Sequence, residues 1–175
     1  MTKLLVVYAS KHHSTAEIAW AIGELLQQSN DVQVDIRSVE VVEDISPYDA
    51  VIVGSAVYMA QWQATAVDFL KKHELELAQR PVWLFSSGPI GQGDPATLLK
   101  GWEFPEALQA LATRIKPRDI ALFHGNLDPT ELNLLERSAV KLIHAKFGDS
   151  RDWNMIRVWA GSIAQVLRTE VRNVR

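Results

Sequence analysis

The residues with the clearest chemical potential lie together near the start of the chain. They form one continuous segment: Ser10, Lys11, His12, His13, Ser14 and Thr15. This segment directly follows the apolar run Leu4–Ala9, and a helical pattern begins immediately behind it. A buried strand that ends in a tight loop and a helix N-terminus directs backbone N–H groups and the positive end of a helix dipole at one spot. A phosphate group, held by amides and hydroxyls with Lys11 nearby, is the simplest ligand for such a spot.

Length and composition place limits on the class of protein. The 175 residues, 47% of them hydrophobic, predict a single domain spanning residues 1–175 with a substantial core. The net charge of −3 gives no general attraction to nucleic acid. The absence of cysteine excludes disulfides, thiolate metal sites and iron–sulfur clusters. No run of about 18 apolar residues is present to span a bilayer, and no signal-like segment precedes the first strand, so we expect a cytoplasmic location.

Strand-like and helix-like patterns alternate along the chain. The predicted strands are Lys3–Ala9, Val32–Arg37, Ala50–Ser55, Pro81–Ser87 and Asp119–Gly125. The predicted helices are Ser14–Ser29, Trp62–His73, Phe104–Ile115, Pro129–Phe147 and Asp152–Arg172, with a short turn at Pro95–Lys100. This alternation predicts an α/β fold with a five-stranded parallel sheet of order 2-1-3-4-5 and helices on both faces. In the fourth helix we expect one apolar stripe made of Leu132, Leu135, Ala139, Leu142 and Ile143.

Sheets of this order bind ligands at the carboxyl ends of their strands, near the point where the strand order reverses. Three segments reach that edge: Ser10–Thr15, Ser55–Trp62 and Ser87–Trp102. At this edge Tyr58, Met59, Trp62 and Trp102 are candidates for ligand contact, with simple packing as the open alternative. Four other tryptophans occur within regular elements, where we expect them to pack: Trp20, Trp83, Trp153 and Trp159.

Several other chemistries are excluded by missing motifs. No G-x-G-x-x-G follows the first strand, and the chain has no G-x-x-x-x-G-K-[ST]. Neither Gly54-Ser55 nor Ser87-Gly88 completes the G-x-S-x-G of a hydrolase. A phosphorylated receiver domain needs acidic residues where this chain has Ala9-Ser10 and Gly54-Ser55. The remaining histidines, His73, His124 and His144, lie on separate predicted elements, which favours hydrogen-bonded or solvent-facing rings over a metal cluster.

With these residues in place, the chain resembles the flavodoxin family, and most closely the branch that includes the menaquinone-dependent protoporphyrinogen oxidases. Three blocks carry the similarity: Val7–Thr15, Asp49–Met59 and Pro81–Pro89. Two tail elements, Phe123–Gly125 and Gly148–Trp153, fit the same branch. The resemblance covers nearly the whole chain and implies a flavodoxin-like three-layer sandwich with bound FMN.

The resemblance also implies roles for individual residues. Ser10, Lys11, His12, His13, Ser14 and Thr15 would wrap the FMN phosphate. One side of the flavin ring would lie against Ser55, Ala56, Val57, Tyr58 and Met59, and the other against Ser87, Gly88, Pro89, Ile90 and Gly91. No side chain is nominated as a catalytic acid, base or nucleophile. Two departures from the family pattern are His13 and Ala60, which stand where glycine is usual; replacing His13 by glycine is expected to preserve or tighten FMN binding.

Three functions remain open at this point. The first is an FMN-dependent oxidoreductase that acts on a quinone- or porphyrinogen-type small molecule. The second is a non-catalytic electron carrier that docks to a redox partner protein. The third is a flavin-free interaction module derived from flavodoxins. The sequence leaves the oligomeric state undetermined.

Overall fold

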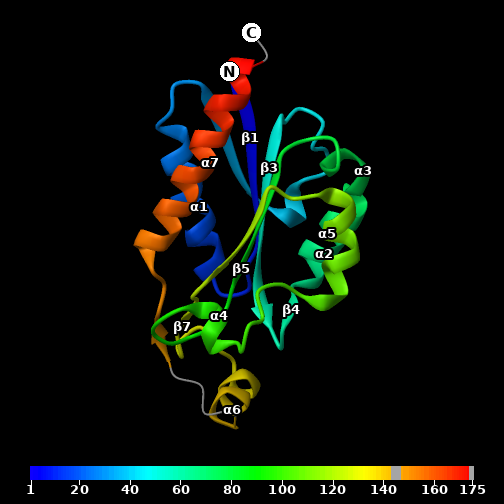
Figure 1. Ribbon diagram of the computed structural model, residues 1–175. Helices are drawn as coiled ribbons and strands as arrows, with labels where there is room; N and C mark the ends of the chain where they lie inside the picture. The colour runs from blue at the N-terminus through cyan, green and yellow to red at the C-terminus, as the bar shows by residue number, and fades with distance from the viewer. Residues whose placement is uncertain (143–146, 174–175) are drawn as a thin grey trace.

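A parallel β-sheet forms the centre of the molecule in the computed structural model, which describes residues 1–142 and 147–173 (Figure 1). Its strands are β1 (Thr2–Ala9), β2 (Val32–Ser38), β3 (Ala50–Tyr58), β5 (Val82–Ser87) and β6 (Asp119–Phe123). They lie in the order β2-β1-β3-β5-β6, and each neighbouring pair is parallel. Counting only these parallel strands, the order is the predicted 2-1-3-4-5. The short strand β4 (Gln61–Trp62) pairs antiparallel with the end of β3.

Helices cover both faces of the sheet, as predicted (Figure 1). One face carries α1 (Ser14–Gln27) and α7 (Trp153–Asn173), and the other carries α2 (Ala64–Lys72), α3 (Glu74–Leu77) and α5 (Gln109–Ile115). The smaller elements are the turns η1 (Val39–Val41) and η2 (Glu106–Leu108), helices α4 (Pro95–Leu98) and α6 (Leu134–Leu142), and the paired strands β7 (Asn126–Leu127) and β8 (Gly148–Asp149).

The alternation of side chains along each strand builds two separate cores. In β1, Leu4 and Val6 pack on the α1/α7 side, whereas Leu5 and Val7 pack on the opposite side, and all four are fully buried. Successive strand residues point to opposite faces, so a continuous apolar run fits only a strand that is covered on both sides. The apolar runs of the sequence therefore determine the three layers directly.

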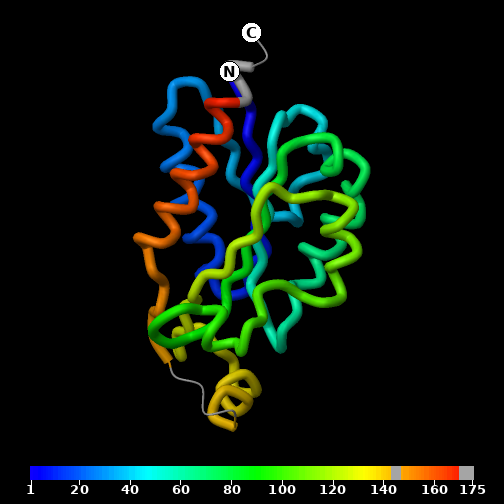
Figure 2. The backbone as a smooth tube through the Cα atoms, in the orientation of Figure 1, coloured from blue at the N-terminus to red at the C-terminus, as the bar shows by residue number. Residues whose placement is uncertain are grey.

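The two ends of the sheet have different roles. The N-terminus and the end of α7 lie together at one end of the molecule (Figure 1). The loops that follow β1, β3 and β5 gather at the opposite end, with α6 beyond them (Figures 1 and 2). Within the described ranges, no helix has the length and apolar character needed to cross a membrane.

The second and third predicted helices differ from the observed elements at their starts. The predicted helix Trp62–His73 begins only at Ala64, because Trp62 belongs to the hairpin strand β4. The predicted helix Phe104–Ile115 resolves into η2 followed by α5. Trp62 is buried in the core, where it meets Phe104 edge-on, so it is a packing residue rather than a ligand contact. Conversely, Trp20 is half exposed although we expected it to pack.

The fourth predicted helix, Pro129–Phe147, is wrong in both its start and its role. Asp128 accepts hydrogen bonds from the amide and hydroxyl of Thr130 and forms a turn. The helix α6 instead begins behind Asn133, whose side chain and amide exchange hydrogen bonds of 2.9 Å with Glu136 in a capping box. Leu132 of the predicted apolar stripe is buried but precedes α6, and none of the α6 residues is buried, so Leu135, Ala139 and Leu142 do not join the core. Ile143 and His144 lie outside the described residues.

Candidate functional site: three loops at the carboxyl ends of β1, β3 and β5

The first loop joins β1 to α1 and ends at His13, the residue that caps α1. His13 lies in the left-handed region, with φ of 55° and ψ of −21°, and its side chain makes no capping hydrogen bond. The amide of Ser14 turns back to His12 O at 2.6 Å, and the first helical hydrogen bond runs from Glu17 N to His13 O. The next amides, those of Thr15 and Ala16, have no intrahelical partners, so they remain available to an anion.

Helix α6 contributes a carboxylate to this first loop. Glu136 forms an ion pair with Lys11, and it also lies 3.5 Å from Nε2 of His12. The hydrogen bond from Lys11 is the main reason that the pKa of Glu136 falls to about 2. The 3.5 Å separation is too long for a good hydrogen bond, and the buried Nε2 of His12 has no hydrogen-bond partner in the described part of the chain. The first loop therefore contains an unsatisfied polar nitrogen next to its lysine.

The second loop is a tight hairpin between β3 and β4. Tyr58 pairs with Gln61, so Met59 and Ala60 form a two-residue turn, with φ of 48° and 59°. Positive φ at both central residues defines a type I′ turn, which normally prefers Asn-Gly. Both positions at which the chain departs from the family glycine pattern, His13 and Ala60, thus have a conformation that glycine would adopt without strain.

The predicted residues of the second loop divide into inward and outward groups. Ser55 is fully buried, and its hydroxyl donates to Ala56 O and accepts from Gln63 N. Its side chain therefore holds the hairpin. Tyr58 and Met59 are exposed at the edge of the sheet, with 43% and 97% of their surface accessible. Partial burial, followed by the charges of Glu136 and Glu131, raises the pKa of Tyr58, which places its ring beside the α6 region.

The third loop follows β5 and is supported by the end of β6. Gly88 N donates to Phe123 O, and Gly125 N donates to Pro89 O at 3.1 Å. A Cβ at position 125 would lie 3.2 Å from the Gly88 carbonyl oxygen, so the two segments can approach this closely because residue 125 is glycine. Among the residues predicted for this side of the ring, Ser87 and Pro89 are buried, and Gly88, Ile90 and Gly91 are partly exposed.

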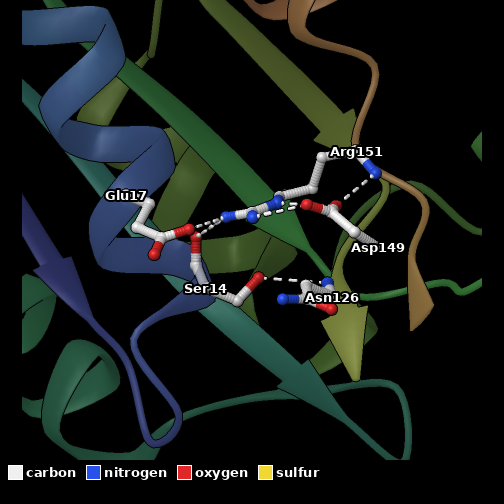
Figure 3. A network of polar contacts seen from close by, with 5 residues as sticks. All are labelled: Ser14, Glu17, Asn126, Asp149 and Arg151. Atoms are coloured by element: carbon white, nitrogen blue, oxygen red, sulfur yellow. Dashed lines mark hydrogen bonds and ion pairs between the residues drawn. The ribbon is translucent and has the colours of Figure 1, made fainter. Parts of the chain in front are cut away.

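A tail segment, residues 148–151, links the first and third loops, although sequence reasoning assigned it no role. Ser150 accepts a hydrogen bond from Gly91 N at 3.0 Å, and its own amide donates to Gly125 O. Ser14 Oγ accepts from Asn126 N at 3.1 Å, next to the tail segment (Figure 3). The sequence showed this segment as part of the Gly148–Trp153 block. Its role was missed because Arg151 contacts Ser14, which lies 137 residues away in the chain.

Arg151 is the centre of this linkage (Figure 3). Its side chain is only 5% exposed, and its guanidinium contacts Asp149, Glu17 and the carbonyl of Ser14. Burial alone would lower the pKa of Arg151, but the hydrogen bonds to Asp149 and Glu17 outweigh it and raise the pKa. The guanidinium also lies over the ring of Trp153, 4.6 Å from its centroid. Two carboxylates balance this cation, so Arg151 holds α1 and the tail together instead of presenting a free charge.

A separate cleft of about 390 Å³ opens between β6, α7 and the segment around α4. Its lining is mainly apolar, with Phe123, Met155 and Trp159, and it includes the carboxylates of Asp94 and Glu103. Carboxylates repel a phosphate, so this cleft does not suit the anion that the first loop fits. Within residues 1–142 and 147–173, no group of three or more His, Asp or Glu side chains is placed to hold a metal ion.

The flavodoxin-domain family profile matches residues 5–154, which is most of the chain and includes all three loops and the tail segment. The chain belongs to the flavodoxin-domain family. No curated protein sequence matches it.

Solved structures with the same fold include flavodoxins and an oxidoreductase. A WrbA-like flavodoxin from Agrobacterium tumefaciens has a TM-score of 0.59 at 15% identity, with 97% of this chain and 99% of that chain covered. Reduced Megasphaera elsdenii flavodoxin has a TM-score of 0.54 at 18% identity, covering 68% and 84%. The rubredoxin:oxygen oxidoreductase of Desulfovibrio gigas reaches a TM-score of 0.65 at 16% identity, covering 98% of this chain but only 37% of that one. The chain thus spans little more than a third of that enzyme.

The loops of this flavodoxin-domain protein fit FMN in chemical terms. The uncapped start of α1 and the hydroxyls beside it together provide donors for a phosphate. The second and third loops follow the adjacent strands β3 and β5, where Ala56 pairs with Ser87. A planar ring that extends from the phosphate would therefore meet both loops at the edge of the sheet.

Proposed function

We propose that this protein binds FMN at the three loops and transfers electrons or hydride equivalents between the flavin and a redox partner. The observation that carries the proposal is the start of α1, which has left-handed His13 at its cap and no side chain to satisfy its amides. Family membership and the flavodoxin fold support the proposal that the anion bound there is the phosphate group of a flavin nucleotide. When bound, the isoalloxazine ring supplies the redox chemistry.

The first loop would bind the phosphate through backbone amides and the hydroxyls of Ser10 and Thr15. Thr15 is almost completely buried at the start of α1, so its side chain has little room to move. The positive end of the helix dipole adds to the attraction. Lys11 contributes less than its charge suggests, because Glu136 already engages it.

The second and third loops would orient the ring and exclude water from its faces. Backbone N–H and C=O groups of residues 55–59 and 87–91 would donate hydrogen bonds to, and accept them from, the polar edge of the ring. Tyr58 and Met59 supply the exposed apolar surface at this end of the sheet. Apart from the phenol of Tyr58, none of these residues carries an ionisable side chain, so the protein's main part is to position and tune the cofactor.

The proposal is tested by titrating the apoprotein with FMN and, in parallel, with riboflavin, which lacks the phosphate. We expect saturable FMN binding that is much tighter than riboflavin binding. Thr15→Val removes a hydroxyl with little change of shape and should weaken FMN binding about fivefold to tenfold, as expected for one lost hydrogen bond. Thr113→Val, on the exposed face of α5, is the matched control. Absence of saturable FMN uptake would refute the proposal.

Two partner classes fit this site. The exposed apolar pair Tyr58 and Met59 favours a quinone- or porphyrinogen-type small molecule, in line with the resemblance to the menaquinone-dependent protoporphyrinogen oxidases. The alternative partner is a redox protein, which would make the chain an electron carrier. Steady-state turnover of protoporphyrinogen with a quinone supports the first class. Rapid exchange only with a reductase and an acceptor protein supports the second.

A further inference from the structure

His124 occupies a buried position directly beneath the third loop. Its side chain is only 3% exposed, and it directly follows β6. Nδ1 lies 3.0 Å from the carbonyl oxygen of Pro89, and Nε2 lies 2.8 Å from the carbonyl oxygen of Gly93. One imidazole ring thus bridges both ends of residues 89–93.

The two contacts bear on the number of protons that the ring carries. A carbonyl oxygen only accepts hydrogen bonds, so each ring nitrogen must donate to make a favourable contact. A neutral imidazole carries one N–H and one lone pair, whereas the imidazolium carries two N–H donors. In either neutral tautomer, a nitrogen lone pair would face a carbonyl oxygen at about 3 Å. Only the imidazolium can donate both hydrogen bonds, whereas a neutral ring donates one of them.

The second buried histidine of the described chain shows the opposite arrangement. His73 is 4% exposed and packs against Phe69, with ring centroids 4.8 Å apart. Its Nδ1 is 3.5 Å from a Glu76 oxygen, and its Nε2 has no hydrogen-bond partner. Burial lowers the pKa of His73, as expected for a ring kept neutral in an apolar environment. His124 is therefore distinguished by its two acceptors and not by burial.

The segment that His124 bridges is part of the candidate flavin site. It contains Pro89, Ile90 and Gly91, which we expect to flank the ring, and its amide at Gly91 is held by Ser150. Gly93 has a φ of 95°, so the backbone there has a conformation that other residues resist. Without the ring of His124, the Gly93 end of this turn would lose a hydrogen bond that runs directly to the body of the sheet.

Asp94 is a charged group that interacts with His124. Asp94, which follows Gly93 and caps α4, has its pKa lowered mainly by Thr97, with a smaller contribution from the charge of His124. In the tail segment, Asp149 and Arg151 pair with each other.

We propose that His124 is a positioning residue that, as an imidazolium, holds residues 89–93 in the conformation that receives the flavin ring. Loss of its proton removes one of the two hydrogen bonds and loosens the loop. Cofactor affinity therefore depends on whether this ring carries its second proton. The part of the proposal that concerns the cofactor rests on the proposed function, whereas the state of the ring does not.

The first test is made on the apoprotein, so it does not depend on FMN. Nitrogen-15 NMR of the histidine rings reports whether each ring nitrogen carries a proton, and amide exchange reports the order of Gly91 and Gly93. We expect both His124 nitrogens to be protonated while these amides are protected. We also expect their protection factors to fall as pH rises through the titration of the ring. The proposal would be overturned if the Gly91 and Gly93 amides stayed equally protected from exchange while the His124 ring was neutral.

The second test compares His124→Gln with the matched control His73→Gln. His124→Gln keeps at most one of the two bonds and should weaken FMN binding on the order of tenfold. Ionisation of the FMN phosphate affects the Kd of variant and wild type equally, so it drops out of their ratio. We expect the ratio of variant to wild-type Kd to shrink as pH rises for His124→Gln. For His73→Gln the ratio should stay constant. A pH-independent ratio for His124→Gln would contradict the proposal. If the wild type binds no FMN, the proposed function fails, and the apoprotein measurement still decides the state of the ring.

Discussion

Gly54 is the position where a single methyl group should have the largest effect on this fold. It lies in the central strand β3, paired with Tyr8 on one side and Phe85 on the other. A Cβ at Gly54 would lie 1.9 Å from Cζ of Phe85 and 2.1 Å from a second ring atom. Gly54→Ala therefore forces the Phe85 ring out of its present position.

The cost follows from what surrounds that ring. To restore an ordinary contact, the ring must move by about 1.5 Å. Phe85 is fully buried, and its centroid is 5.9 Å from that of Phe123 and 6.1 Å from that of Trp159, so little space is available. Overpacking of this kind costs about 3 kcal/mol, and the lower backbone entropy of unfolded alanine returns about 1 kcal/mol. We expect a net loss of about 2 kcal/mol, which for a chain of this size lowers Tm by about 4–8 °C.

Urea unfolding followed by circular dichroism measures the effect. The matched control is Gly161→Ala in α7, where a Cβ meets nothing within 4 Å and should stabilise the helix by up to about 1 kcal/mol. The double variant Gly54→Ala/Phe85→Leu should recover part of the loss, with a coupling energy above about 1 kcal/mol. A Gly54→Ala protein within about 0.5 kcal/mol of the wild type would refute the packing argument.

Three further predictions concern the loops and the pH response. His13→Gly and Ala60→Gly each remove the strain of a non-glycine residue at positive φ, so each should raise the free energy of unfolding by up to about 1 kcal/mol in urea titrations. FMN affinity should not fall. A marked loss of affinity in His13→Gly would show that the imidazole itself is a ligand. Glu136→Gln releases Lys11 and removes a negative charge beside the first loop, so FMN should bind severalfold more tightly at low salt and the gain should fade at high salt, with exposed Glu106→Gln as the control. Burial lowers the pKa of His73, so its neutral form stabilises the fold above about pH 6.5 and this contribution is lost as the pH falls; the urea midpoint of His73→Gln should depend less on pH below that value, and an unchanged profile would contradict the assignment.

The strands and their order could be predicted because short stretches of sequence carry the patterns that indicate them. Continuous apolar runs such as Leu4–Val7 mark strands that are buried on both faces, and alternating helical patterns leave few topologies open. The predicted helix at Pro129 failed because Asp-Pro-Thr is equally suited to a turn, and the capping box four residues later decided the start of α6. Similarly, Trp62 was placed at the ligand edge because the hairpin turn at Met59-Ala60 lacks the usual Asn-Gly signal.

The sequence by itself determined the layers, the strand order and the segments that meet at the carboxyl edge of the sheet, because hydrophobic periodicity is local and the handedness of crossovers is general. Only the tertiary structure decided what supports that edge: Arg151 against Ser14 and Glu17, Ser150 beneath Gly91, and His124 between Pro89 and Gly93. These contacts join residues that lie 31 to 137 positions apart. Each depends on side-chain geometry that exists only after the sheet has brought distant loops together, so no pattern along the chain could reveal it.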